Sequence, residues 1–197
     1  MTDPAMTAPI GREAFVAATR GLPELRITEV VLQTARWQQM KDWYTAFLGV
    51  EPHFETDTMC FRRVNDAHGQ LFVLFRVPEA PPAGAEPAPP ASSGLNHVQF
   101  KAGSLREALE RHERLYAVGI VPTRSYNHGP STALYYRDPD GNTMEISGPN
   151  FPSEAEYRAY MQTDAFRRNP RGVPIDPVEM LSRLRGGAPQ AELIRIG

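Results

Sequence analysis

Three polar side chains stand in apolar segments whose alternating pattern is typical of half-buried strands. Glu29 lies in Thr-Glu-Val-Val-Leu, His97 in Asn-His-Val-Gln-Phe and Glu145 in Asn-Thr-Met-Glu-Ile. A carboxylate in such a strand is costly to bury unless it is paired or bound to a metal. An imidazole and two carboxylates, with positions left open for a substrate, suit Fe(II) or Mn(II) better than a closed zinc site. We therefore expect Glu29, His97 and Glu145 to hold a metal ion.

Two further side chains that can handle protons precede Glu145. His128 stands before a Gly-Pro turn, and Tyr135 lies in the strand-like run at 134–137. The turn Asp-Pro-Asp-Gly at 138–141 then returns the chain into the strand that carries Glu145. Beside a metal, His128 would be an acid/base or a hydrogen-bond donor, and Tyr135 would donate to an oxygen of the substrate.

Each of these residues also has an ordinary structural interpretation. His97 could be a hydrogen-bonded core histidine, and Glu29 could be a solvent-facing strand residue paired with an arginine. His128 could bond the backbone of its loop, and Tyr135 could be a half-buried strand tyrosine. His112 is expected at the surface of a helix and has no predicted role.

The elements that position these residues occur twice along the chain. Each time a β-rich run precedes an amphipathic helix, and the similar segments Leu-Gly-Val-Glu-Pro (48–52) and Val-Gly-Ile-Val-Pro (118–122) close the helix and begin the next strand. Two further short strands complete each βαβββ module. In this register Glu29 and His97 occupy corresponding positions. The prediction is an α+β fold in which two paired βαβββ modules form an incomplete barrel around a cleft.

The chain divides into five segments. They are an N-terminal arm (1–25), the first module (26–78), a Pro/Ala-rich linker (79–94), the second module (95–148) and a helical C-terminal tail (149–197). The linker cannot pack a core and is expected to be a semi-extended spacer. Capping patterns at Ser153 and Asp176 predict two helices in the tail. These helices would pack against the outside of the barrel or against a second subunit.

Composition excludes several classes of function. With 22% charged residues and a formal net charge of −2, the chain has no electrostatic footprint for nucleic acid or an anionic membrane. No apolar run is long enough to span a bilayer, and the N-terminus has no signal-peptide pattern. The single Cys60 excludes an internal disulfide and a multi-cysteine zinc site. A cytoplasmic location is the expectation.

The second module carries a motif that points to a family. The run Tyr-Arg-Asp-Pro-Asp-Gly-Asn-Thr-Met-Glu at 136–145, within paired βαβββ modules, resembles the vicinal oxygen chelate superfamily of glyoxalases, bleomycin-resistance proteins and dioxygenases. Within it, His128, Tyr135 and Glu145 are spaced as in the type I extradiol ring-cleaving dioxygenases. That resemblance implies an Fe(II) ion held by two His and one Glu, a catechol-like substrate and O2. His97 and Glu145 match two ligands, His128 the neighbouring histidine and Tyr135 the family's tyrosine.

The first module departs from that pattern at two positions. Glu29 stands where the first histidine ligand is usual, which lowers the net charge of the site by one unit. The metal would be a weaker Lewis acid, and Mn(II) would compete better with Fe(II). Relatives carry a catalytic histidine near the position of Gly69. Here only His68 is close, and it could act there only if the strand shifted by one residue.

The leading hypothesis is a metal-dependent extradiol-type dioxygenase acting on a catechol-like aromatic. The three predicted ligands would hold Fe(II), and His128, Tyr135 and His68 would orient and protonate the substrate. One alternative is a non-oxidative metalloenzyme of the superfamily, an isomerase or lyase, although Val73 stands where these enzymes often have a fourth ligand. Another is a metal-free protein that binds small molecules. The expected partners are a small aromatic substrate and O2, with no nucleic acid or membrane, in a homo-oligomer expected to be a dimer.

Overall fold

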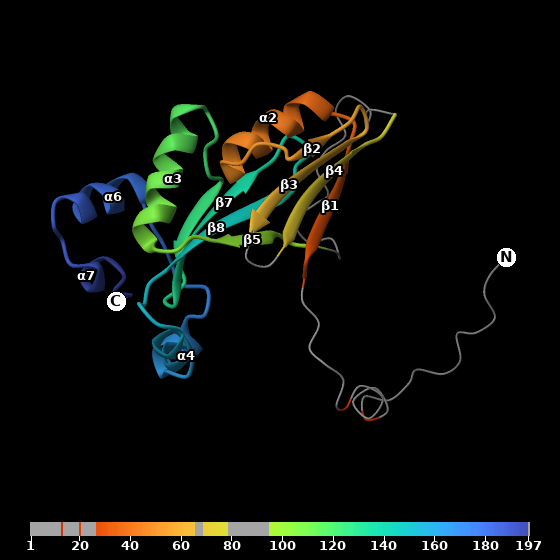
Figure 1. Cartoon of the computed structure of the whole chain (residues 1–197). Helices are drawn as coiled ribbons and strands as arrows, with labels where there is room; N and C mark the ends of the chain where they lie inside the picture. Colours follow the sequence, from red (N-terminus) through yellow and green to blue (C-terminus); the bar gives the residue numbers. More distant parts are fainter. Residues whose placement is uncertain (1–12, 14–19, 21–26, 66–68, 79–94, 197) are drawn as a thin grey trace.

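Two mixed β-sheets with helices on one side make up the centre of the molecule (Figure 1). The computed structural model describes residues 13, 20, 27–65, 69–78 and 95–196. The first sheet has the strand order β1-β4-β3-β2, and the second has the order β5-β8-β7-β6-β9. Over these described residues, neither sheet closes into a barrel. The predicted α+β fold with two open, paired sheets is confirmed.

The first module is a βαβββ unit. It consists of β1 (Glu29–Thr34), α2 (Trp37–Leu48), β2 (Phe54–Glu55), β3 (Met59–Asn65) and β4 (Gln70–Arg76). β1 pairs parallel with β4, whereas β2, β3 and β4 are antiparallel neighbours. α2 ends at Gly49, whose φ of 68° is the left-handed conformation that glycine adopts most easily. The predicted end of this helix is therefore correct.

The second module repeats this order. It consists of β5 (Val98–Lys101), α3 (Leu105–Ala117), β6 (Arg124–Asn127), β7 (Ser131–Arg137) and β8 (Thr143–Pro149). β5 pairs parallel with β8, and β6, β7 and β8 are antiparallel neighbours. At the start of α3, Ser104 Oγ accepts a hydrogen bond from the Glu107 amide at 3.1 Å, as the capping pattern predicted. The repeat in the sequence is thus a repeat in the structure.

The core lies between the helices and the sides of both sheets that face them. Its buried side chains come from both modules and include Met40, Tyr44, Phe47, Phe72, Leu134, Tyr136 and Ile146. Phe47 of α2 packs edge-on against Phe100 and Tyr136 of the second module, with 5.6 Å between ring centroids in each pair. The two modules therefore share one core, as expected for units too small to bury their sheets alone.

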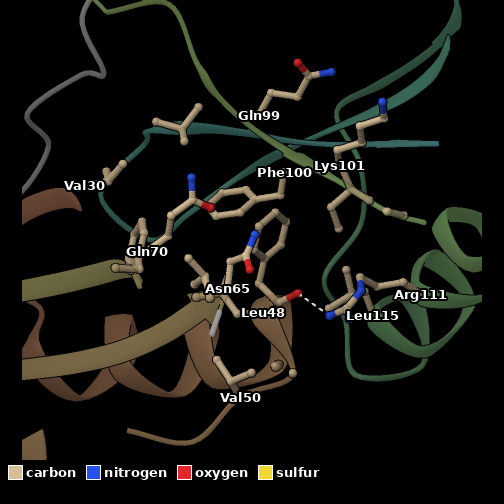
Figure 2. Close-up of a pocket in the computed structure, with 18 of the residues that line it drawn as sticks. Val30, Leu48, Val50, Asn65, Gln70, Gln99, Phe100, Lys101, Arg111 and Leu115 are labelled. Carbon is tan, nitrogen blue, oxygen red and sulfur yellow. Dashed lines mark hydrogen bonds between the residues drawn. The ribbon is translucent and has the colours of Figure 1, made fainter. Parts of the chain in front are cut away.

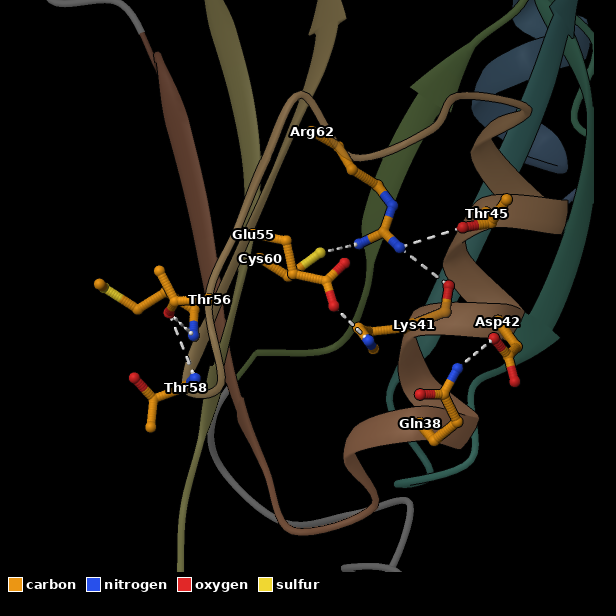
Figure 3. A network of polar contacts seen from close by, with 10 residues as sticks. Gln38, Lys41, Asp42, Thr45, Glu55, Thr56, Thr58, Cys60 and Arg62 are labelled. Carbon is orange, nitrogen blue, oxygen red and sulfur yellow. Dashed lines mark hydrogen bonds and ion pairs between the residues drawn. The ribbon is translucent and has the colours of Figure 1, made fainter.

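One cation is buried inside the first module (Figure 3). The guanidinium of Arg62 lies between β3 and α2, where it donates to the Lys41 carbonyl oxygen at 2.9 Å and to Thr45 Oγ1 at 3.1 Å. It also donates to Cys60 Sγ at 2.9 Å. Burial raises the pKa of the Cys60 thiol above its ordinary value, so this cysteine stays a neutral thiol. We conclude that Cys60 has a packing role.

The described part of the C-terminal tail, residues 149–196, contains four helices rather than the two predicted. They are α4 (Glu154–Met161), α5 (Asp164–Arg168), α6 (Pro177–Arg185) and α7 (Gln190–Leu193). The two predicted helices, α4 and α6, begin where Ser153 and Asp176 accept backbone hydrogen bonds. α6 packs on α3 through a shared apolar cluster that includes Leu105, Leu109, Met180, Leu181 and Leu184. The tail thus covers the outside of the second module. Among the described helices, none combines the length and apolar character that crossing a membrane requires.

The prediction of a surface position for His112 is wrong. This side chain lies on α3 but is only 2% exposed, and its Nδ1 is 3.3 Å from Tyr136 Oη. It shares the buried face of α3 with Ala108 and Leu115, four residues before and three residues after it. Its Nε2 is buried without a hydrogen-bond partner among the described residues. Burial lowers the pKa of His112, so the imidazole is neutral in the folded protein.

Candidate active site

A group of polar side chains lies on the face of the second sheet that points away from the core. Because side chains alternate along a strand, Phe100 of β5 reaches the core while His97 and Gln99 point to the opposite face. Glu145 of β8 lies on that same face, since it pairs with Gln99 in β5 and with Tyr135 in β7. The structure therefore brings together three of the residues predicted from the sequence: His97, Tyr135 and Glu145.

His97 and Glu145 form a close pair. His97 Nε2 lies 2.9 Å from Glu145 Oε2, and His97 Nδ1 lies 2.7 Å from Asn96 Oδ1. Because an amide oxygen only accepts, Nδ1 carries a proton and Nε2 is the nitrogen directed at the carboxylate. Histidines that bind a metal have this arrangement, with one nitrogen on the metal and the other donating to an oxygen. Glu145 is 3% exposed, so its charge requires partners in this position.

Gln99 holds the carboxylate of Glu145 from the other side. Its Nε2 donates to Glu145 Oε1 at 3.1 Å and to Ser147 Oγ at 2.7 Å. Both oxygens of Glu145 therefore have a polar neighbour, and the plane of the carboxylate is set by Gln99 of β5 and by His97, which immediately precedes β5. The sequence analysis missed Gln99. Its position two residues after His97 places it on the same strand face, and that spacing could have identified it.

Tyr135 and His128 form the second polar pair of the site. Tyr135 Oη lies 3.0 Å from His128 Nε2, and His128 Nδ1 lies 2.8 Å from the carbonyl oxygen of Arg171. Since a carbonyl oxygen only accepts, His128 carries its proton on Nδ1. In the neutral imidazole, Nε2 then accepts the hydrogen bond that the Tyr135 hydroxyl donates. The side chain of His128 is thus aimed at Tyr135 by the tail of the protein.

The charges around Tyr135 determine its protonation state. Burial, together with the nearby Glu145 carboxylate, raises the pKa of Tyr135 to about 12. The Arg124 guanidinium opposes this rise, because its Cζ lies 4.3 Å from the centre of the tyrosine ring. Tyr135 therefore remains a phenol at neutral pH and can donate a hydrogen bond. Arg124, which the sequence analysis also missed, lies directly opposite Tyr135 in the pairing of β6 with β7.

The tail approaches His128 very closely. The short strand β9 (Val173–Pro174) pairs with β6, and Asn127 is opposite Val173. Gly172, at φ 74°, makes this approach possible, since a Cβ there would collide with the carbonyl oxygen of Asn127 and with the Cα of His128. No sequence pattern predicted this contact, because β9 has only two residues.

The structure does not bring Glu29 into the same group. Glu29 is exposed on β1, and β1 and β5 are edge strands of different sheets. The repeat therefore predicts the depth of Glu29 and His97 within their own sheets, but it does not fix the distance between them. Within the described ranges, no three His, Cys, Asp or Glu side chains are placed to hold a metal ion together. His68 lies outside the described residues, so its role and that of Glu29 stay predictions.

Glu29 and His97 nevertheless line one cleft between the modules. Figure 2 shows part of this cleft, with Gln99 and Phe100 labelled. The cleft has a volume of about 1310 Å³, and Gln99 also lines it. Glu145 adjoins the cleft through its contacts with His97 and Gln99. The donors that are in place, an imidazole with a directed Nε2 and a buried carboxylate, fit two ligands of a metal such as Fe(II). The cleft leaves open positions beside them.

The chain belongs to the Glyoxalase/Bleomycin resistance protein/Dioxygenase superfamily, whose family model matches residues 26–146. Among curated relatives, biphenyl-2,3-diol 1,2-dioxygenase 2 of Rhodococcus globerulus is 35% identical over 164 residues, which cover 83% of this chain and 84% of the relative. Biphenyl-2,3-diol 1,2-dioxygenase 3 of the same organism is 33% identical over 169 residues, which cover 85% and 86%. The crystal structure of lactoylglutathione lyase from Agrobacterium tumefaciens has a TM-score of 0.49 at 23% identity, over 64% of this chain and 94% of that protein.

Proposed function

We propose that the protein is a metal-dependent extradiol-type dioxygenase that uses O2 to cleave the ring of a catechol-like aromatic. The pairing of His97 with Glu145, next to the pair of Tyr135 with His128, is the observation that carries this proposal. The two Rhodococcus relatives, named for a biphenyl diol, support the choice of an aromatic diol as substrate. Leu48 and Phe100, which are partly exposed on the walls of the cleft, offer apolar surface to such a ring.

His97 and Glu145 would hold the metal, and Glu29 is the proposed third ligand. Fe(II) is the proposed metal, with Mn(II) as the second choice. The ion would supply Lewis acidity that favours the deprotonated diol and an electron for the activation of O2. Gln99 contributes by fixing the orientation of Glu145. The change from histidine to glutamate at the third position should weaken the binding of an anionic diol.

Tyr135 and His128 are the residues that would donate and accept protons. The phenol of Tyr135 stays protonated at neutral pH. In the presence of substrate its single proton could turn from His128 Nε2 to an oxygen of the diol, which would leave Nε2 free. His128 Nε2 can accept a proton from the diol, because the carbonyl oxygen of Arg171 keeps the other ring nitrogen protonated. His68 is proposed as a further acid/base residue. The cytoplasmic location and the dimer also stay predictions from the sequence.

Metal content and oxygen consumption together test this proposal. The protein is purified without air, its iron and manganese are measured, and O2 uptake is followed with catechol and with 2,3-dihydroxybiphenyl. We expect iron, and one O2 consumed for each diol that is cleaved. His97→Ala should abolish uptake, while the matched change His53→Ala, at an exposed histidine outside the site, should not. Bound metal with no uptake would favour an isomerase or lyase, and the absence of metal binding would favour a binding protein.

A further inference from the structure

The cleft between the modules is larger than a catechol ring requires. Its volume of about 1310 Å³ exceeds the roughly 300 to 1,000 Å³ of most small-molecule sites. His97 and Gln99 line one part of it. Another part is lined by the C-terminal end of α2 and by α3, on the side where Leu48, Arg111 and Leu115 lie in Figure 2. A substrate that filled this space would extend well beyond its diol.

The walls between these two parts are mainly apolar. The partly exposed apolar side chains there come from both modules and include Val30, Leu48, Val64, Leu71, Val98 and Phe100. A ligand with an apolar body of one or two rings could lie along this surface, because the removal of apolar groups from water favours binding. The polar side chains at the two ends of the cleft therefore select ligands by the polar groups at their ends.

Arg111 is a half-buried cation in the α3 part of the cleft. Its Nη1 donates to the carbonyl oxygen of Phe47 at 2.9 Å (Figure 2). The other N–H groups of the guanidinium can donate to a ligand. In the part of the chain that the structure describes, no carboxylate forms an ion pair with Arg111. A cation in an apolar setting without a counter-ion favours the binding of an anion.

Two acidic side chains of α3 that also line the cleft already have partners. Glu107 Oε2 accepts a hydrogen bond from the Gly103 amide at 2.9 Å, and Glu110 Oε1 lies 3.8 Å from Arg106 Nη1. Lys101, the other cation near Gln99, lies 3.9 Å from Glu154. Two arginines of α3 therefore remain on this wall, Arg111 and Arg114. Arg114 is exposed to water, which screens its charge, whereas Arg111 is half-buried and can bind an anion more strongly.

We propose that the α3 end of the cleft binds the carboxylate of an apolar aromatic acid through Arg111. A planar guanidinium can bind a carboxylate through two parallel hydrogen bonds, and these gain strength where water is partly excluded. The substrate class that follows is an aromatic diol with an acidic arm, its diol beside His97 and its acid beside Arg111. This identification of the substrate rests on the proposed function, whereas the binding of the acid does not.

Calorimetry with a matched pair of ligands tests the proposal without metal or O2. Biphenyl-4-carboxylate and its uncharged amide have nearly the same shape and differ in charge. We expect the acid to bind about tenfold to a hundredfold more tightly, the factor that a hydrogen bond to a charged group supports. Arg111→Met should remove this preference and leave the affinity for the amide unchanged. Arg183→Met, at an exposed arginine of α6 outside the cleft, should keep the preference.

Two further results keep the test decisive if Arg111→Met fails to fold. Arg111→Lys keeps the charge and should keep part of the preference for the acid, and added salt should reduce it. Equal affinity of the wild-type protein for acid and amide, or no binding of either, would overturn the inference. A clear preference for the acid in a protein that consumes no O2 would refute the proposed function alone. Turnover of neutral diols without any preference for acids would refute this inference alone.

Discussion

Replacement of Gln99 by leucine should show how strongly the buried carboxylate of Glu145 depends on its partner. The amide of Gln99 makes two hydrogen bonds, to Glu145 Oε1 at 3.1 Å and to Ser147 Oγ at 2.7 Å, and Glu145 is only 3% exposed. A hydrogen bond to a charged group contributes about 1.5 to 3 kcal/mol, and a neutral one about 1 kcal/mol. The apolar side chain of leucine keeps most of the packing of Gln99 and so offsets part of the lost hydrogen-bond energy. We expect Gln99→Leu to lower the free energy of unfolding by about 2 kcal/mol.

Urea unfolding followed by circular dichroism measures this loss, and metal titration provides a second measurement. Removal of a group that orients a metal ligand typically weakens metal binding by about tenfold to a hundredfold. Gln33→Leu is the matched control, because Gln33 is an exposed glutamine on β1. It should change neither quantity. If Gln99→Leu unfolded at the same urea concentration as the wild type and bound metal equally well, the role assigned to Gln99 would be refuted.

Three other changes test the remaining parts of the site and its supports. Tyr135→Phe should lower kcat/KM for ring cleavage by about a hundredfold, because His128 loses its hydroxyl partner, while the melting temperature changes little; equal rates in a stopped-flow assay would refute a role in proton transfer. Asp138→Ala should lower the free energy of unfolding in urea by about 3 kcal/mol, because it leaves the buried Tyr44 hydroxyl, 2.7 Å away, without its acceptor; Asp138→Asn should recover part of this loss. The pKa of His112 is lowered in the folded state from an ordinary value of 6.5, so the unfolded chain takes up a proton that the folded protein does not. Stability should therefore be highest above that value and fall as the pH drops below it, and His112→Phe should flatten this acid limb in urea titrations.

The repeat made the architecture predictable, and its limits explain what was missed in the site. Each module could be recognised from the order of its elements, and Gly49 and Ser104 mark helix boundaries at the expected places. The position of Glu29 relative to His97 could not be predicted, because no hydrogen-bonded ladder joins β1 to β5 and fixes the distance between them. His112 was predicted at the surface because histidine is a polar residue. Its spacing of four residues from Ala108 and three from Leu115 indicates the buried face of α3 instead.

Within the second module, the predictions followed the local rules of strands. Tyr135 and Glu145 were expected on one hairpin, and their pairing across β7 and β8 follows from a turn of known length. Gln99 followed from the same rule and was overlooked. The contact of His128 with the carbonyl oxygen of Arg171 joins positions 43 residues apart through a backbone atom. Side-chain patterns carry no information about such a contact, so it required the structure.

The contact between Gly172 and His128 shows that the candidate active site extends beyond the two repeated modules. A fragment that ended after residue 148 would contain both modules and every predicted metal ligand. It would lack the carbonyl oxygen of Arg171, so the imidazole of His128 would be free to exchange its tautomers and to rotate away from Tyr135. A fragment cut at this domain boundary would therefore lose the contact that fixes the imidazole of His128. The smallest useful unit of this chain extends at least to Pro174, where β9 ends.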